Sequence, residues 1–217
     1  LCFIDRDGNV ITPVNTADKG VDTLFDEQTY LDKDKSYMSG TYFDEIYHPR
    51  TAYEFLHRMS VYEWTHPPLG KVLVGIGIMI FGMVPFGWRF VGTLLGVVMV
   101  PIVYLMTKRC MKYSWLAVLG CVLFTFDFMH FTQTRLATID TYVTLFIMLM
   151  YYYMYKYYTK SFYDTPLYKT LVPLGISGIF FGLSVASKWT GLYAGVGLAL
   201  IFFITLYYRY REYRYAL

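Results

Sequence analysis

Long apolar runs separated by short basic clusters make up most of the chain after residue 87. The runs cover residues 88–107, 115–131, 142–158, 171–187 and 189–208. Each approaches the roughly 20 apolar residues that an α-helix needs to cross the hydrocarbon core of a bilayer. The pattern therefore predicts five transmembrane helices.

Two shorter amphipathic or apolar segments come before these runs. From residue 51 to residue 62, apolar side chains recur at steps of three and four with charged side chains between them. This pattern predicts a short helix at the membrane interface, too polar to cross. Residues 71–86 are apolar but short and rich in glycine, which leaves a short span or an interfacial helix as options.

The basic clusters orient the predicted helices. They lie at residues 108–112, 156–169 and 209–214, and the positive-inside rule places such clusters in the cytoplasm. If the five spans alternate in direction, the segments 85–89, 132–140 and 187–190 lie on the opposite side. Asp44 and Glu45 share that outer side only if residues 71–86 do not cross. We therefore interpret residues 71–86 as a juxtamembrane helix.

Composition and charge agree with this division. The chain is 56% hydrophobic and 20% aromatic, which is too apolar for an ordinary soluble domain. Residues 1–45 carry 10 acidic and 4 basic side chains, whereas residues 46–217 carry 6 acidic and 15 basic ones. We predict an extracytoplasmic loop over residues 1–70, irregular up to residue 39, and a transmembrane bundle over residues 71–217. The fold class is an all-α polytopic membrane protein.

Cysteine usage and the two ends of the sequence add little chemistry. The three cysteines have no metal-ligand spacing, so we predict neither a disulfide framework nor a zinc site. The chain opens at Leu1 without an initiator Met or a signal peptide and closes after a basic cluster. We expect it to be the N-terminal part of a longer protein.

Ionisable residues gather on the predicted outer side of the bundle. Ionisable side chains near lipid are costly unless they are paired or used. For the basic ones, an alternative is that they extend towards lipid phosphate groups. Their joint presence with an acid pair favours a site. The residues are Asp44, Glu45, His66, Arg89, Arg135, Asp140 and Lys188.

Four motifs carry a family resemblance. In chain order they are FDEIYHP followed by HPPLGK, GWRFVGTLLGVVMVPIVYL, FDFMHFTQTRLATID, and GLSVASKWTG. Together, over about residues 40–195, they resemble the protein O-mannosyltransferase family, and bacterial members most. Family members are polytopic glycosyltransferases of the GT-C class that use a lipid-phosphate sugar donor. Four motifs in matching order are a far more specific signal than any one of them alone.

The resemblance implies roles for individual positions. Asp44 matches the acid of the family's first outer loop, which is taken as the catalytic base, and Glu45 beside it is implied to bind the acceptor. Arg89 matches the arginine that holds the donor phosphate. The family's HPP turn and its arginine-to-aspartate motif fall on His66, Arg135 and Asp140. One position departs from many eukaryotic members, which have an acid two residues before the histidine. Here Trp64 stands there, with Glu63 one step earlier.

The chemistry can also be argued from the residue types. Transfer of a sugar from a lipid phosphate to a hydroxyl needs a carboxylate base for that hydroxyl. The leaving phosphate needs positive charge more than it needs a proton. We therefore expect inverting single displacement, in which Asp44 takes the proton and Arg89, together with Lys188 or Arg135, binds the phosphate. We predict no cofactor and no metal site, although the acids could supply oxygen ligands to a divalent cation.

Function and location follow as expectations. We expect a glycosyltransferase that moves a sugar from a polyprenyl or dolichyl phosphate donor to a Ser/Thr hydroxyl of a protein. The family resemblance implies that the sugar is mannose. It would lie in a bacterial plasma membrane, in contact with membrane lipids, with its site on the extracytoplasmic side and with no nucleic acid partner. The alternatives are a lipid-linked sugar transporter or flippase and an inactive membrane scaffold.

Three further features have structural interpretations. Asp127 lies in an apolar run and either pairs with His130 or Arg135 or lines the donor cavity. The tyrosines between residues 151 and 158 are typical of an aromatic belt at the membrane interface. The glycines at positions 175, 178 and 182 predict close packing between helices.

Overall fold

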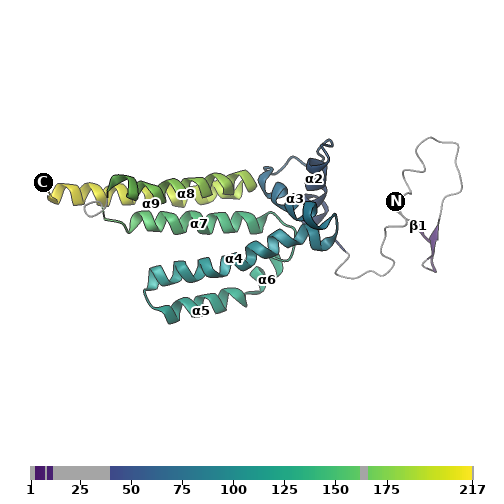
Figure 1. The fold of residues 1–217 in the computed structure, drawn as a ribbon, viewed down its shortest axis with the longest axis horizontal. Coiled ribbons are helices and arrows are strands. Elements are labelled where there is room, and N and C mark those ends of the chain that lie inside the picture. The colour runs from purple at the N-terminus through teal and green to yellow at the C-terminus, as the bar shows by residue number, and fades with distance from the viewer. Residues whose placement is uncertain (1–2, 8, 12–39, 162–165, 217) are drawn as a thin grey trace. The chain divides into compact units, whose positions relative to one another are not determined.

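The structure is a computed structural model that describes residues 3–7, 9–11, 40–161 and 166–216. The chain divides into two compact units, residues 1–40 and 41–217, and both are drawn in Figure 1. The first unit is small, and its described part is a hairpin. The second unit is helical and contains every predicted site residue.

The hairpin of the first unit pairs two short antiparallel strands, β1 (Phe3–Ile4) and β2 (Val10–Ile11). The Asp5 carboxylate stabilises its turn, because it accepts a hydrogen bond of 2.9 Å from the backbone N–H of Asp7, as Asp side chains commonly do in turns. The sequence predicted irregular structure for residues 1–39. The hairpin is the regular structure that this prediction missed, and the rest of that range lies outside the described residues.

The second unit is built of helices. Its described residues begin with a 3₁₀ helix, and the elements that follow it there are α-helices. The elements are η2 (Phe43–Ile46), α2 (His48–Leu56), α3 (Leu69–Phe81), α4 (Pro85–Met111), α5 (Ser114–Thr125), α6 (Phe128–Gln133), α7 (Asp140–Tyr158), α8 (Leu167–Ser187) and α9 (Thr190–Ala216).

The long helices run alongside one another, as Figure 1 shows. α4 packs against α5 and α7, and α7 packs against α8 and α9. Among the described residues, α4, α8 and α9 are long and apolar enough to cross a membrane. This confirms an all-α polytopic membrane protein. Helices α2 and α3 lie at one end of the bundle (Figure 1).

Two of the five predicted spans are weaker than the sequence pattern indicated. α5 is apolar but has only 12 residues, about 18 Å of helix. α7 has 19 residues but is not among the helices that meet the length and hydropathy requirement, since much of its second half is tyrosine. The number of crossings therefore stays a prediction.

The predicted helix over residues 115–131 is broken in the structure. α5 ends at Thr125, and Asp127 begins α6, because the Asp127 carboxylate accepts a hydrogen bond of 2.8 Å from the backbone N–H of His130. Such a cap satisfies a backbone donor that has no partner within the helix. Of the roles considered for Asp127, the structure supports a structural one, through the backbone of His130 rather than through its ring.

The interfacial helix also differs from its predicted bounds of 51–62. α2 starts at His48 and stops at Leu56, and Arg58 then adopts a left-handed backbone conformation with φ of 55°. The chain folds back onto the helix because the Glu54 carboxylate accepts a hydrogen bond of 2.9 Å from the backbone N–H of Tyr62. A contact across eight residues ends the helix here, and the apolar spacing alone did not show it.

The juxtamembrane helix α3 is short and lies close to α4. Its 13 residues form about 20 Å of helix, against a hydrocarbon core of about 30 Å. It ends at Gly82, whose φ of 84° favours glycine. At Gly77 a Cβ atom would lie 2.2 Å from the carbonyl oxygen of Gly87, so only glycine permits this approach of α3 to α4.

A buried core joins the short helices to the long ones. It includes Ala52 from α2, Val74 from α3, Trp88 from α4 and Tyr142 from α7. The core anchors α2, α3 and the start of α4 to one end of the bundle. The glycines of α8 at positions 175, 178 and 182 behave differently, since a Cβ atom there would have no neighbour within 4 Å. The prediction that they mediate close helix packing is wrong for the described residues.

Candidate active site

A buried ion pair connects η2, which carries Glu45, to α4, which carries Arg89. The guanidinium of Arg89 donates two hydrogen bonds to the Glu45 carboxylate, from Nε to Oε1 at 2.7 Å and from Nη2 to Oε2 at 2.6 Å. The Glu45 side chain is 0% exposed and that of Arg89 is 18% exposed. A two-point contact of this kind is among the strongest that arginine makes. The resemblance implied acceptor binding for Glu45 and phosphate binding for Arg89, and these roles stay predictions; the structure places the two side chains in contact.

Two backbone N–H groups also donate hydrogen bonds to the Glu45 carboxylate. The N–H of Ala137 donates to Oε1 at 2.8 Å and the N–H of Tyr42 donates to Oε2 at 2.9 Å. Burial acts to raise the pKa of Glu45, but the hydrogen bonds from Arg89, Ala137 and Tyr42 outweigh it and hold the pKa below its usual range. Glu45 is therefore ionised at neutral pH.

Asp44, in contrast, is partly open to solvent. Its side chain is 26% exposed, and its Oδ2 lies 3.9 Å from Nε2 of His48. The imidazole of His48 is buried, and burial lowers its pKa to about 4, aided by Lys71 and His66 and opposed by Asp44 and Glu63. His48 is therefore neutral at physiological pH. Of the two adjacent acids, Asp44 is the one that a substrate can reach.

A second buried cation holds the loop that carries His66. The Nζ of Lys71, whose side chain is 1% exposed, forms an ion pair with the Glu63 carboxylate. It also donates hydrogen bonds to the backbone carbonyls of Glu63 at 3.0 Å and His66 at 3.3 Å. Burial raises the pKa of Glu63, but Lys71 and Thr65 outweigh it and lower the pKa to about 2. Glu63 stands three residues before His66, where many eukaryotic members have their acid two residues before it. In this structure Glu63 stabilises the loop by pairing with Lys71.

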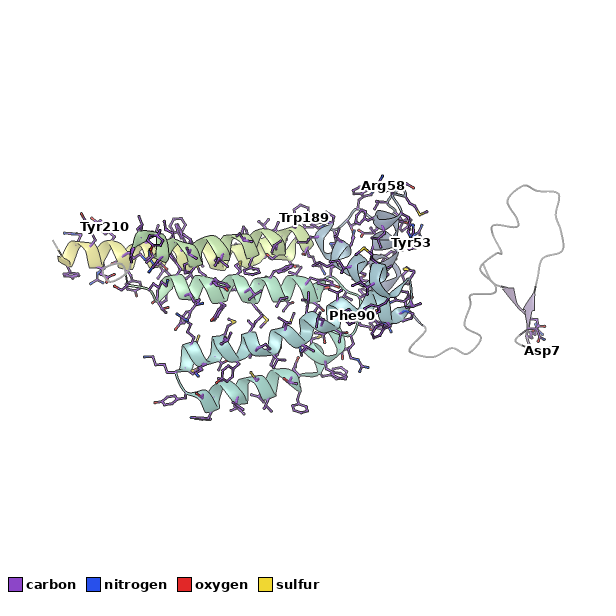
Figure 2. The ribbon with its side chains drawn as sticks, in the orientation of Figure 1. Asp7, Tyr53, Arg58, Phe90, Trp189 and Tyr210 are labelled. Carbon is purple, nitrogen blue, oxygen red and sulfur yellow. The ribbon has the colours of Figure 1, made fainter. Side chains whose placement is uncertain are left out.

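The remaining predicted residues lie at the same end of the bundle. Lys188, which follows α8, donates a hydrogen bond of 2.7 Å to Oδ1 of Asp140 at the start of α7. Beside it, the indole N–H of Trp189 donates to the carbonyl of Thr65 at 3.3 Å. Figure 2 shows Trp189 at the end that also bears Tyr53 and Arg58, with Tyr210 at the other end.

Arg135 stands apart from these pairs. It follows α6, is exposed, and has its guanidinium carbon 4.8 Å from the centre of the Phe131 ring. Among the described residues no carboxylate is in ion-pair contact with it. The cations expected to bind phosphate therefore differ in availability, since Arg89 and Lys188 have carboxylate partners whereas Arg135 lies over a ring and has no such partner in the described part of the chain.

The described residues contain no group of three or more His, Cys, Asp or Glu side chains placed to hold a metal ion. The acids of this end instead face cations or the backbone. The absence of a metal requirement stays a prediction. Asp44 is a carboxylate that a substrate can reach, at the end of the bundle that also carries Arg89, Arg135 and Lys188. A base and positive charge at one end suit proton abstraction beside an anionic leaving group.

Comparison with known families decides the membership of the chain. The family model described as dolichyl-phosphate-mannose-protein mannosyltransferase matches residues 10–214. The chain belongs to this mannosyltransferase family. The resemblance read from the four motifs is confirmed, and the mycobacterial and corynebacterial relatives support a bacterial-type member.

The relatives carry matching names. The chain is 36% identical over 112 residues to the polyprenol-phosphate-mannose--protein mannosyltransferase of Mycobacterium tuberculosis, covering 49% of this chain and 22% of that protein. The protein of the same name from Mycolicibacterium smegmatis is 28% identical, covering 70% and 33%. Dolichyl-phosphate-mannose--protein mannosyltransferase 1 of Saccharomyces cerevisiae is 24% identical, covering 73% and 21%. The chain spans a fifth to a third of these relatives, and no solved structure matches it.

Some residues of this mannosyltransferase-family site did not stand out in the sequence. Lys71 lies within HPPLGK, but the motif predicted no role for it, although a lone lysine at the start of an apolar helix indicates a buried partner. His48 had no distinguishing pattern. The backbone N–H of Ala137 could not be found from sequence, because any residue type supplies that group.

Proposed function

We propose that the protein transfers mannose from a polyprenyl-phosphate carrier to a Ser or Thr hydroxyl of a protein. The family supports the reaction class, and the printed names of the bacterial relatives support the donor and the protein acceptor. The observation that carries the proposal is the reachable Asp44 carboxylate beside the buried Glu45–Arg89 pair. That arrangement places a base next to positive charge at one end of a membrane bundle.

The reaction is an inverting single displacement. The acceptor hydroxyl oxygen attacks the anomeric carbon of mannose, and the bond between that carbon and the phosphate oxygen breaks. Asp44 takes the hydroxyl proton, and the polyprenyl phosphate leaves with the electron pair of the broken bond. One base is enough for this route, whereas retention through a covalent intermediate would need a carboxylate nucleophile on the other face of the sugar.

Positive charge stabilises the leaving phosphate. Arg135 is exposed and has no carboxylate partner among the described residues, so we assign it the main contact with the phosphate. Lys188 and Arg89 contribute charge from positions already neutralised in part by Asp140 and Glu45. His66 supports the site through the loop that Lys71 holds.

The site faces the extracytoplasmic side of a bacterial plasma membrane. The sidedness of charge supports this orientation, because the opposite end of the bundle carries the basic clusters that stay in the cytoplasm. The α9 segment from Tyr207 to Arg214, with its arginines and tyrosines, belongs to that end. A polyprenyl carrier in the outer leaflet would then reach Asp44 and Arg135 together.

One assay separates this function from its alternatives. Membranes containing the protein are incubated with radiolabelled polyprenyl-phosphate-mannose and a Ser/Thr-rich acceptor protein. Transfer gives labelled acceptor that releases mannose on β-elimination. A flippase would move the labelled lipid between leaflets without labelling the acceptor, and a scaffold would do neither. Either of those two results would overturn the proposal.

A further inference from the structure

The Glu45 carboxylate has no hydrogen-bonding capacity left for a substrate. Four hydrogen bonds end on it, two from the Arg89 guanidinium and one each from the backbone N–H groups of Ala137 and Tyr42. Two carboxylate oxygens accept about four hydrogen bonds, so this group is saturated. Its side chain is also 0% exposed. Direct binding of an acceptor hydroxyl would require at least one of these bonds to break.

The same carboxylate connects three segments that are far apart in the chain. Arg89 belongs to the first turn of α4, 44 residues away, and Ala137 lies in the connection between α6 and α7, 92 residues away. That connection carries Arg135 two residues before Ala137 and Asp140 three residues after it. Loss of the Glu45 carboxylate would therefore remove two hydrogen bonds from the Arg89 guanidinium and one from the backbone N–H of Ala137, in two different segments, which is costly.

Asp44 is held by this arrangement through the backbone. The two residues are adjacent in the short 3₁₀ helix η2, where neighbouring side chains point in directions about 120° apart. Once Glu45 is fixed inward, the direction of the Asp44 side chain is fixed as well. We propose that Glu45 and Arg89 form a clasp that fixes the position of Asp44 by tying η2 to α4 and to the α6–α7 connection, and that Glu45 does not bind the acceptor. This inference rests on the function proposed above for Asp44.

The clasp and an acceptor-binding role predict different kinetics. A residue that binds the acceptor raises its KM when removed. A positioning residue lowers kcat, because a displacement of the base by about 1 Å can cost about 100-fold in rate. For Glu45→Gln we expect kcat to fall by about 100-fold and the acceptor KM to change by less than about threefold. A rise in acceptor KM with kcat preserved would overturn the clasp.

A matched control lies in α2 at the same end of the bundle. Glu54 is also buried and forms an ion pair with an arginine, Arg50, at 3.0 Å, but it contacts neither Asp44 nor the α6–α7 connection in the described structure. Glu54→Gln should leave kcat within about threefold of the wild type, because it perturbs α2 without releasing the base. An equal fall in kcat in both variants would show that any loss of a buried acid has this effect, and would overturn a specific role for Glu45.

Hydrogen exchange tests the clasp without reference to activity. In Glu45→Ala the N–H of Ala137 loses its acceptor, so the peptide covering residues 134–140 should exchange at least about tenfold faster than in the wild type. A peptide from α8 serves as the internal reference for folding. If exchange in residues 134–140 is unchanged, the clasp is wrong. If exchange accelerates but the wild-type protein transfers no sugar, the clasp stands and the proposed function fails.

A double variant completes the test. Because Glu45 positions Asp44 together with Arg89, and Arg89 also contributes charge to the phosphate, Arg89→Gln should lower kcat at least as much as Glu45→Gln. The double variant should lose no more than about threefold beyond Arg89→Gln. If the fold-loss in kcat of the double variant equals the product of the two single fold-losses, Arg89 and Glu45 act independently, which would contradict the clasp.

Discussion

The two ends of the helical unit treat charge in opposite ways. At the end that carries the candidate site, acids and bases meet in pairs: Arg50 with Glu54, Lys71 with Glu63, Arg89 with Glu45, and Lys188 with Asp140. At the opposite end, cations lie over tyrosine rings, as Lys108 does over Tyr104 and Lys156 over Tyr152. The only acidic side chain described there is Glu212.

The difference in charge pairing distinguishes the two ends as surroundings for a site. The Lys71–Glu63 and Arg89–Glu45 pairs are largely removed from water, where ion pairs require matched partners in a fixed geometry, so they hold side chains of this end in defined places. Cations over tyrosines at a membrane interface need no fixed partner, because the ring and the lipid phosphates both satisfy them. The first end is suited to chemistry and the second to anchoring in the bilayer.

The largest loss of stability should come from breaking the most buried pair. Lys71→Met leaves the Glu63 carboxylate without its cation and frees two backbone carbonyls. We expect a loss of about 3–5 kcal/mol in the free energy of unfolding, measured by thermal or denaturant unfolding in detergent. The control is Lys156→Met at the tyrosine-lined end. Equal losses for the two variants would remove the distinction between the ends.

The second largest effect concerns catalysis. Arg135→Gln should lower kcat/KM for the polyprenyl donor by at least about 100-fold, since it removes the charge assigned to the leaving phosphate. Arg211→Gln is the matched change at the opposite end, where the guanidinium lies 5.8 Å from the centre of the Tyr215 ring. We expect it to leave transfer unchanged. Comparable losses would mean that general positive charge, and not a site, governs donor use.

Acidification should weaken the paired end through His48. Its pKa is lowered to about 4 in the folded protein, against about 6.5 when unfolded, so the unfolded state binds more protons between these values. Stability from this group is present above pH 6.5 and is lost as the pH falls towards 4. The loss between pH 7 and pH 5 should be about 2 kcal/mol.

Two variants isolate this contribution. His48→Leu should flatten the fall in melting temperature between pH 7 and pH 5, because neither ring nitrogen of His48 has a hydrogen-bond partner in the described structure that leucine would leave unpaired. His57→Leu, a change of an exposed histidine, should leave the fall intact. An unchanged pH dependence in His48→Leu would show that another group is responsible.

The smallest effect is expected at the tyrosine-lined end. Lys156→Gln removes a cation that lies 5.0 Å from the centre of the Tyr152 ring and 5.1 Å from that of Tyr153. The expected cost is about 0.5–1 kcal/mol in the free energy of unfolding, with no change in transfer. A cost as large as that of Lys71→Met would contradict the view that Lys156 rests on tyrosine rings without a carboxylate partner among the described residues.

The apolar pattern predicted the long helices because hydropathy and length are local properties. α4, α8 and α9 occur where the runs predicted them, with bounds shifted by up to eight residues, most at the end of α9. The break before α6 and the early end of α2 were missed. Each depends on one hydrogen bond, from the backbone of His130 to Asp127 and from that of Tyr62 to Glu54, which averaged hydropathy does not register.

The site was predicted in its residue types but not in its pairings. The sequence placed Asp44, Glu45 and Arg89 on one side, but two adjacent acids look alike until the backbone fixes which one points inward. The inward acid is Glu45, and its burial depends on Arg89 and on a backbone N–H supplied by the connection before α7. Such tertiary contacts cannot be deduced from spacing along the chain.

The most direct test of the account compares one carboxylate from each end. Asp44→Asn and Glu212→Gln each replace an acid by its amide, and transfer of mannose to the acceptor protein is measured under single-turnover conditions. We expect Asp44→Asn to transfer at least about 100-fold more slowly, with normal folding, and Glu212→Gln to match the wild type. Transfer by Asp44→Asn at a rate close to that of the wild type would contradict the assignment of Asp44 as the base.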